Sequence, residues 1–327
     1  MKVSVVICAY TFDRWDSLVA SMQSCDVQTL RPLEIIVVVD YNSELLARAM
    51  REFPSAVVIA NRSVKGLSGA RNTGVAISSG DAIAFLDDDA YAEPEWLERL
   101  TRPLSDSKVA GVGGWILPDW ESHSAPWFPE TFYWILGCSY AGLPKDNQTI
   151  RNPIGASMAI RRGVFASVGG FTSGIGRVGS TPLGCEETEL CIRYTEQFAG
   201  ERFVLARAAV VHHLVPASRL TWKYFWTRCW AEGISKAAVS TLVGTGSGLS
   251  SERRHVVRAL PLEIGRSVRM LARDPRSASR RIALMVMGTL IAVAGLLRGH
   301  VALRRRPIVI DHEALELLIV ALKDEAG

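Results

Sequence analysis

Three consecutive carboxylates, Asp87, Asp88 and Asp89, directly follow the apolar run at residues 83–86. A short apolar run predicts a buried strand, so these acidic residues stand where the strand ends. Massed carboxylates repel one another and lose hydration, and a hard divalent cation relieves both costs. Ligands of open α/β sheets also bind beyond the carboxyl ends of the strands. The stretch therefore predicts a site for a divalent metal and a diphosphate.

Helix capping is a simpler explanation for part of this cluster. Asp89 could cap a helix that begins near Glu93-Pro94-Glu95-Trp96, because a capping side chain accepts hydrogen bonds from the free N–H groups of a first turn. Capping uses one carboxylate and leaves two unexplained, so we favour the metal site.

A second acidic group, Glu186-Glu187-Thr188-Glu189, opens a predicted helix at residues 184–193. The helix dipole alone favours acidic residues in a first turn. Two imidazoles, His212 and His213, follow in a predicted strand at 210–215. Alternation places them on opposite faces, so at most one of them faces a site.

Strand and helix patterns alternate before these groups. Apolar, β-branched runs at 3–8, 33–39 and 56–60 predict strands, and helical spacing fills the intervals between them. Such alternation on short connections predicts right-handed βαβ units in a doubly wound parallel sheet. No Gly-x-Gly-x-x-Gly follows the first strand, so the dinucleotide fingerprint is missing.

Residues 111–171 carry four tryptophans with several prolines and glycines, which suggests irregular loops over a pocket. A ring such as Trp115 could stack on a sugar or a lipid, or could simply pack a second sub-core. Residues 152–160 read as a loop followed by a strand, and small residues such as Gly155 let the backbone approach a ligand.

Composition suggests a globular protein with an apolar bias: 48% of the 327 residues are hydrophobic, and mean hydropathy is +0.16. The net charge is +4, with arginine concentrated at residues 253–306. A basic, apolar C-terminal third suits an anionic membrane surface better than nucleic acid, for which no motif occurs. Six cysteines without C-x-x-C spacing predict thiols of a reducing compartment, and no secretory signal opens the chain.

The C-terminal part predicts a helical extension at 244–327 that follows a catalytic domain at 1–243. Residues 282–297 are apolar on every face and are flanked by arginines, but they are fewer than the roughly 20 that a membrane span needs. We favour a membrane-embedded or interfacial segment, because little chain remains to cover such a helix. A core helix or a dimer interface is the competing explanation.

Several motifs occur together in a fixed order: Ser4-Val5-Val6-Ile7-Cys8-Ala9-Tyr10, Asp40, Gly66-Leu67-Ser68-Gly69-Ala70-Arg71-Asn72, the aspartate cluster, and Glu186-Glu187-Thr188-Glu189-Leu190. In this combination the chain resembles family 2 glycosyltransferases over about residues 1–230. The resemblance implies a GT-A-type fold, with a Rossmann-like, mostly parallel sheet and flanking helices. It also implies a nucleotide-binding half at about 1–110 and an acceptor half at about 111–243.

The resemblance also implies roles for individual residues. Ala9 and Tyr10 would line the nucleotide, Asp40 would accept a hydrogen bond from uracil, and Arg71 would lie near the base and diphosphate. Asp87 and Asp89 match the Asp-x-Asp motif, in which Asp89 would ligate Mn²⁺ or Mg²⁺. His213, in a Val-x-His-x-Val context, would face the metal or diphosphate. Gly66, Asp88 and Gly155 would complete the donor site.

The catalytic base is implied less uniquely. The family usually has Glu-Asp where this chain has Glu186-Glu187, so Glu187 is the candidate base and Glu186 remains an alternative. More loosely, Arg219, Arg228 and Glu232-Gly233-Ile234-Ser235-Lys236 resemble lipid-linked glucuronosyltransferases. We therefore place Trp115, Arg219 and Arg228 at the acceptor or its phosphate.

The expected activity is inverting, metal-dependent transfer from a UDP-sugar to a hydroxyl acceptor. UDP-glucuronic acid and UDP-glucose are the candidate donors. A lipid-linked acceptor, with polyprenyl phosphate as the carrier, or a cell-envelope glycan is expected, on the cytoplasmic side of the plasma membrane.

Two alternatives remain at this point. A nucleotidyltransferase would carry a basic, glycine-rich loop after its first strand, and Tyr10-Thr11-Phe12-Asp13 is not one. A non-catalytic membrane module on a degenerate fold would have lost the acidic residues, yet Asp87, Asp89 and Glu187 are present.

Overall fold

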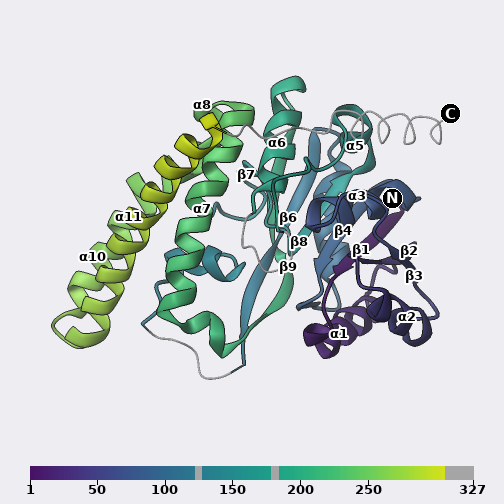
Figure 1. Ribbon diagram of the computed structural model, residues 1–327, viewed down its shortest axis with the longest axis horizontal. Helices are drawn as coiled ribbons and strands as arrows, with labels where there is room; N and C mark the ends of the chain where they lie inside the picture. The colour runs from purple at the N-terminus through teal and green to yellow at the C-terminus, as the bar shows by residue number, and fades with distance from the viewer. Residues whose placement is uncertain (122–126, 178–183, 306–327) are drawn as a thin grey trace.

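The computed structural model describes residues 1–121, 127–177 and 184–305 (Figure 1). In these residues a nine-stranded sheet is flanked by helices, and a layer of long helices stands beside it. Arg306, which the sequence placed in the basic flank of the apolar segment, lies outside the described residues.

The N-terminal half of the sheet is parallel, as the alternating patterns predict. Its strands are β1 (Val3–Ala9), β2 (Glu34–Val39), β3 (Val57–Ala60) and β4 (Ala82–Asp87), in the order β3-β2-β1-β4. The helices between them are α1 (Trp15–Asp26), α2 (Ser43–Glu52) and α3 (Leu67–Ile77). All four strands therefore direct their carboxyl ends to the same edge.

The second half of the sheet is mixed. Its strands are β5 (Ala90–Ala92), β6 (Val109–Trp120), β7 (Thr149–Ile150), β8 (Ser157–Arg161) and β9 (Arg202–Val215). They continue the sheet in the order β4-β8-β6-β9-β5, with β7 paired to β9. Among the described strands, β5, β7 and β8 run against the other six. The expected α/β class with a mostly parallel sheet is confirmed.

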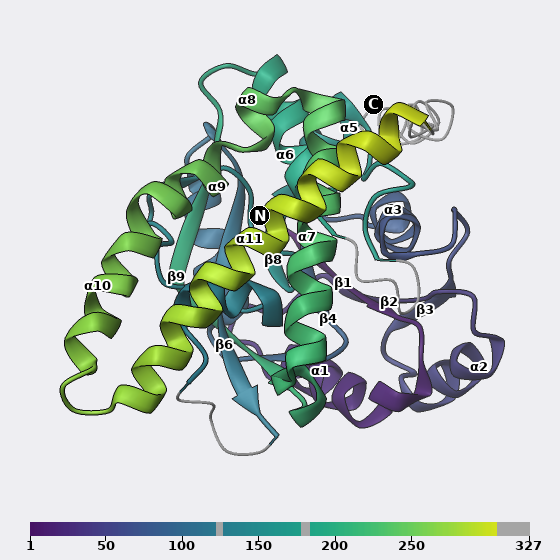
Figure 2. The same cartoon turned by 60° about the vertical axis from the view of Figure 1, so that its left-hand side comes forward.

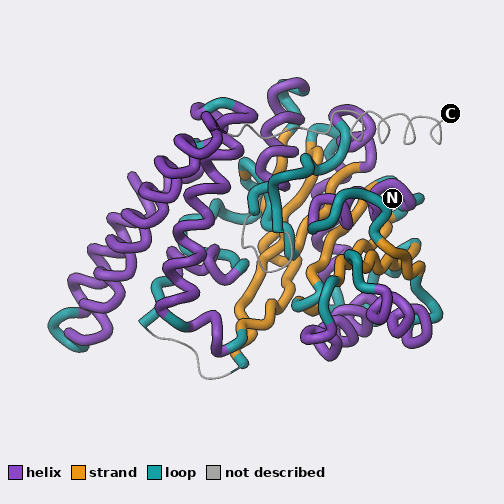
Figure 3. The backbone as a smooth tube through the Cα atoms, viewed as in Figure 1, coloured by secondary structure: helices purple, strands orange, loops and turns teal. Residues whose placement is uncertain are grey.

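One long strand, β6, corrects the expectation of irregular loops at residues 111–120, and it pairs with the even longer β9. β6 has 12 residues and β9 has 14, and they pair in parallel along most of their length (Figure 3). Gly111 and Gly113 concealed β6, because glycine weakens a strand pattern. A Cβ on Gly111 would lie 2.8 Å from the ring of Phe203, so the close approach of the two strands requires glycine there.

Alternation along the strands separates two cores. In β1, Val5 and Ile7 face a core formed with α1, α2 and α4 (Trp96–Thr101), whereas Val6 faces the opposite core. The second core also receives α3, α5 (Arg162–Val168) and α6 (Glu186–Gln197). Because both faces are covered, the strands read as continuous apolar runs rather than alternating ones.

A helical layer completes the described chain. It contains α7 (Trp222–Val243), α8 (Thr245–Gly248), α9 (Ser250–Arg254), a π-helix at His255–Ala259, α10 (Leu260–Met270) and α11 (Pro275–Arg305). Figure 1 shows α7 between the sheet and α11, and Figure 2 shows α11 crossing over α7. The crossing is close because Gly233 of α7 lies against the backbone of Ala292 and Leu296.

This arrangement corrects two premises about residues 282–297. They belong to a 31-residue helix, and residues 275–304 are long and apolar enough to cross a membrane by length and composition. The chain also does supply a covering layer, since α7 and α10 pack against one side of α11. Only 33% of its most apolar stretch is buried, so the described residues leave much of this helix uncovered.

Candidate active site

The aspartate cluster lies at the junction of β4 and β5. Asp87 is the last residue of β4, and the turn Asp88-Asp89 leads into β5. The backbone carbonyl of Asp89 accepts a hydrogen bond from Leu214 N–H at 2.8 Å, and β5 pairs Ala90 with His213. The ladder between β5 and β9 therefore brings His213 to Asp89 across more than 120 residues of sequence.

Asp89 is the most heavily contacted carboxylate of the cluster. Its Oδ1 lies 3.1 Å from His213 Nε2, and its Oδ2 lies 2.9 Å from Arg219 Nη2 and 3.2 Å from Arg14 Nη2. Burial alone would raise the pKa of Asp89, but His213 and the two arginines outweigh it and hold the pKa well below the usual range. Burial likewise would lower the pKa of His213, and Asp89 raises it to about 10.

The two histidines diverge as strand alternation predicts. His213 is buried beside Asp89, whereas His212 stacks on Tyr91 with ring centroids 5.0 Å apart and lies 3.3 Å from Glu93. Asp87, Asp89 and His213 each offer one ligand atom, and these atoms lie within 4.8 Å of one another. Once His213 has released its proton, two oxygens and one imidazole nitrogen suit Mn²⁺, and Mg²⁺ accepts the carboxylates.

Arg14 belongs to this cluster although it was not expected there. Its Nη1 lies 2.7 Å from Asp88 Oδ1, and it bridges to Asp89. Asp88 Oδ2 is buried without a partner among the described residues, and burial raises the pKa of Asp88 despite Arg14. The sequence contained a signal for this position of Arg14, because the residue follows the carboxyl end of β1, at the same edge of the sheet as the aspartates.

Arg71, on α3, joins the aspartates to the glutamates of α6. Its Nη1 lies 2.6 Å from Glu186 Oε1, and its Nη2 lies 3.5 Å from Asp87 Oδ1. Gly155 borders this guanidinium group, since a Cβ there would lie 3.0 Å from Arg71 Nη1. Gly155 therefore makes room for the side chain of Arg71. The sequence-based expectation was that its small size lets the backbone approach a ligand, and Gly155 does line the cavity described below.

Glu186 and Glu187 differ in their partners. Glu186 is buried and paired with Arg71, while no described residue forms an ion pair with Glu187. Burial and the neighbouring Glu186 raise the pKa of Glu187 to about 8. Glu187 therefore has the properties of a proton acceptor near neutral pH, and Glu186 those of a fixed counter-ion.

A cavity of about 390 Å³ connects these groups. Its lining includes Asp87, Asp89, His213, Arg71, Gly155, Glu186, Glu187, Arg219 and Arg228. Arg177, which sequence reasoning missed, also lines it, and burial with Arg228 and Arg219 nearby lowers the pKa of Arg177. One end of the cavity is therefore strongly basic and suited to an anion.

A smaller hollow adjoins the main cavity, and both are lined by Leu67, Asp87 and Arg177. Ala9, Tyr10, Asp40 and Asp88 line the hollow. Asp40 accepts hydrogen bonds from the N–H of Gly66, at 3.0 Å, and from Asn61 at 2.7 Å. The residues expected at the nucleotide thus gather beside the aspartates.

Trp115 lies apart from this gathering. It is half-buried under the guanidinium group of Arg207, 4.0 Å from the ring centroid, and packs at the edge of the second core. Trp115 is not among the described residues that line either cavity.

Comparison with known proteins identifies the class. Residues 4–169 match the model of glycosyl transferase family 2. A glucosyl-dolichyl phosphate glucuronosyltransferase from Haloferax volcanii is 36% identical over 246 residues, which cover 74% of this chain and 78% of that relative. The succinoglycan biosynthesis protein ExoM from Rhizobium meliloti is 27% identical over 233 residues, 68% of this chain and 70% of that protein.

The chain therefore belongs to glycosyl transferase family 2, and it is a glycosyltransferase. The family resemblance read from the motifs is confirmed. The nucleotidyltransferase and the non-catalytic module are set aside as alternatives.

Proposed function

We propose that this glycosyltransferase moves a sugar from a UDP-sugar to a hydroxyl group of a lipid-linked acceptor, with inversion at the anomeric carbon. The main support for this proposal is that Asp87, Asp89, His213 and Glu187 line one cavity. The aspartates and imidazole suit a diphosphate held through a metal, and the carboxylate of high pKa suits proton abstraction.

Asp87, Asp89 and His213 would hold Mn²⁺ or Mg²⁺, and their donor set fits either ion. The bound ion would neutralise charge on the departing diphosphate. Arg219, Arg177 and Arg228 add fixed positive charge along the same wall. Arg71 holds Glu186 in place and lies beside Asp87.

Glu187 acts as the general base in this proposal. It takes the proton of the acceptor hydroxyl as that oxygen attacks the anomeric carbon from the face opposite the diphosphate. The hydroxyl oxygen bonds to the sugar, the bond from the sugar to the diphosphate breaks, and the diphosphate leaves with its electron pair. Glu186 is the alternative base, and its ion pair with Arg71 argues against it.

The apolar part of the cavity supports a lipid-linked acceptor. Trp134 and the α11 residues Ala292, Val293 and Leu296 line the same cavity as the acidic groups. The relative from Haloferax volcanii is named for a glucosyl-dolichyl phosphate substrate and for glucuronosyl transfer. We therefore propose a polyprenyl-phosphate-linked acceptor, with UDP-glucuronic acid and UDP-glucose as candidate donors.

Exposed apolar side chains support membrane attachment. Trp222, Trp226 and Trp230 are exposed at intervals of four on α7, and Leu290 and Leu297 are exposed on α11. Aromatic side chains at this spacing suit a membrane interface, and the arginines of α10 and α11 suit anionic headgroups. We propose that the enzyme works peripherally or shallowly inserted at the cytoplasmic face of the plasma membrane. In this proposal residues 1–243 form the catalytic domain, and residues 244–327 form the attached extension.

A screen of nucleotide sugars with Mn²⁺ or Mg²⁺ and a membrane lipid extract tests the proposal. We expect transfer or hydrolysis of one UDP-sugar that depends on metal, and titration calorimetry should show UDP binding that is strengthened by Mn²⁺. Transfer from a non-uridine donor, or activity unaffected by chelators, would refute the donor or the metal respectively.

A further inference from the structure

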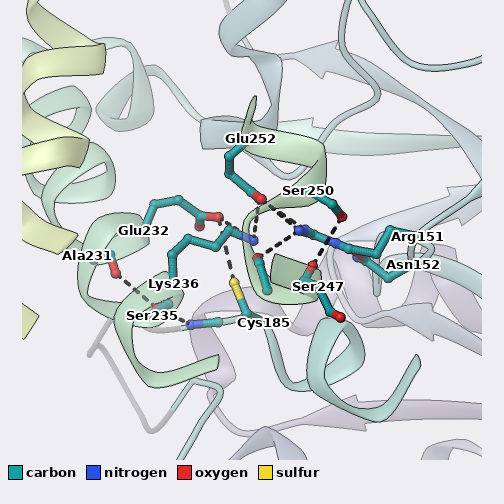
Figure 4. Close-up of polar contacts among 12 residues, drawn as sticks. Arg151, Asn152, Cys185, Ala231, Glu232, Ser235, Lys236, Ser247, Ser250 and Glu252 are labelled. Carbon is teal, nitrogen blue, oxygen red and sulfur yellow. Dashed lines mark hydrogen bonds and ion pairs between the residues drawn. The ribbon is translucent and has the colours of Figure 1, made fainter. Parts of the chain in front are cut away.

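A partly buried network of charged side chains joins Arg151, Glu232, Lys236 and Glu252 (Figure 4). Lys236 of α7 is 7% exposed, and its Nζ lies 3.1 Å from Glu232 Oε1 and 3.0 Å from Glu252 Oε1. Arg151, after β7, binds Glu252 with two hydrogen bonds of 2.7 and 3.0 Å. The network therefore joins the sheet, α7 and the C-terminal helices.

Residues of α7 in and beside this network also contact the turn that leads into α6. Gly184 N–H donates to Ser235 Oγ at 3.1 Å, and Cys185 Sγ lies 3.6 Å from Glu232 Oε1. Cys185 adopts a left-handed conformation with φ of 77°, which a residue with a Cβ holds only when its surroundings fix it. Glu186 and Glu187 follow this residue directly, so their positions depend on the turn.

Glu252 is the member that comes from the C-terminal helices. Burial alone would raise its pKa, but Lys236 and Arg151 outweigh burial and lower the pKa to about 2. Glu252 is therefore ionised throughout the working range of pH. Its removal would leave the buried Lys236 with Glu232 alone and the partly buried Arg151 without this carboxylate, which is more costly than the loss of a surface pair.

We propose that Glu252 and Lys236 are positioning residues for sugar transfer. Glu252 holds Lys236, and α7 with Glu232, Ser235 and Lys236 holds the Gly184-Cys185 turn that presents Glu187. The C-terminal helices are thus a working part of the catalytic site, in addition to any role at a membrane. This inference rests on the proposed function, because it takes Glu187 as the base.

Kinetics of Glu252→Gln provide the first test, with Glu263→Gln as the matched control. Glu263 lies in the same C-terminal helices, where it is buried and pairs with Arg281 at 2.6 Å and Arg266 at 3.3 Å, but it does not line the cavity. We expect kcat to fall roughly tenfold to a hundredfold in Glu252→Gln, because small misplacements of a reacting group cost this much. UDP affinity should stay within about twofold of the parent protein, since the aspartate cluster is untouched.

The control should lose thermal stability to a similar extent while keeping kcat. Glu252→Asp, which retains the charge, should recover part of the lost rate. If Glu263→Gln loses as much kcat as Glu252→Gln at equal loss of stability, the network is merely structural and the inference is wrong.

A second test does not need activity. The thiol of Cys185 is buried, so its labelling by a maleimide reports opening of the turn, and Cys25 in α1 is a buried internal reference. Peptide mass spectrometry should show labelling of Cys185 about tenfold faster in Glu252→Gln or Lys236→Met, with Cys25 unchanged. Equal acceleration at both thiols would overturn the inference. Failure of the proposed function would instead show as absence of transfer in the parent protein, with the labelling result intact.

Discussion

Arg71 and Glu186 form a buried ion pair across 115 residues of sequence, with Nη1 and Oε1 2.6 Å apart. The pair ties α3 to the start of α6 and sets the two glutamates apart chemically. Glu186 is held by a fixed cation, and Glu187 is left with a raised pKa at the cavity wall. One arginine thus gives two neighbouring glutamates different environments.

Glu187→Gln should fold and bind UDP normally but lose transfer by about two to four orders of magnitude, the usual contribution of a general base. Steady-state kinetics beside UDP titration calorimetry measure both properties. In Glu186→Gln the partner of Arg71 is weakened, so a smaller loss of rate with lower stability is expected. An inactive Glu186→Gln beside an active Glu187→Gln would reverse the two roles.

The pH dependence of kcat/KM, which reports the free enzyme, should follow Glu187. Because burial and Glu186 raise its pKa to about 8, the base is protonated below that value and the rate should fall as pH decreases through it. The sign for stability is opposite, since a folded-state pKa above the unfolded one means that stability is lost as pH rises. The melting temperature should therefore decline between about pH 5 and 9 less in Glu187→Gln than in the parent protein. Identical slopes would contradict the assignment.

Asp89→Ala should abolish transfer and remove the strengthening of UDP binding by Mn²⁺. The change deletes a proposed ligand and leaves Arg14, Arg219 and His213 without their shared carboxylate. Calorimetry with and without Mn²⁺ separates the metal effect from general loss of binding. Turnover near that of the parent protein would place the metal elsewhere.

Gly155→Ala should lower both stability and activity, because the added methyl group meets the guanidinium group of Arg71. Overpacking of this kind costs about 1–3 kcal/mol, and movement of Arg71 would also disturb Glu186. Gly163→Ala is the matched control, since nothing lies within 4 Å of its Cβ and the residue is helical. Thermal denaturation and kcat should separate the two variants, and equal behaviour would show that Arg71 adjusts freely.

Sedimentation with anionic liposomes tests the membrane surface. The full chain should pellet with the vesicles, and Trp226→Gln combined with Leu297→Gln should weaken binding about tenfold, because two exposed apolar anchors are lost. Val27→Gln, an equally exposed position in the N-terminal half, should change nothing. A full chain that ignores liposomes would refute membrane attachment.

Truncation of the C-terminal helices is a less suitable test of membrane attachment. A chain ending near residue 250 would lose Glu252 and the cover that α11 gives to α7. Lys236 and Arg151 would then remain buried without that counter-ion, so such a chain should misfold whether or not the helices bind lipid.

The parts predictable from sequence were those encoded locally. Residues 3–8 are rich in β-branched apolar residues, which predicted a parallel strand. Residues 83–86 are apolar and are followed by three carboxylates, which predicted an acidic edge of the sheet. Strand β6 was hidden by its glycines, of which Gly111 makes room for Phe203, about 90 residues away. Glu252 was missed for the same reason, because Arg151 is 101 residues distant and no local pattern distinguishes this carboxylate from a surface charge.

The main cavity is lined both by residues of the sheet and by residues of the C-terminal helices, and this has a consequence for engineering. Donor-side groups such as Asp40 and Asp87 come from the first hundred residues, whereas Val293 and Leu296 of the cavity come from α11. Exchanging helices among family members could therefore recombine acceptor preference with an unchanged donor site. Such a chimera must keep compatible charges at residues 151, 236 and 252, because mismatched charges there would disrupt the contact between the sheet and the exchanged helices.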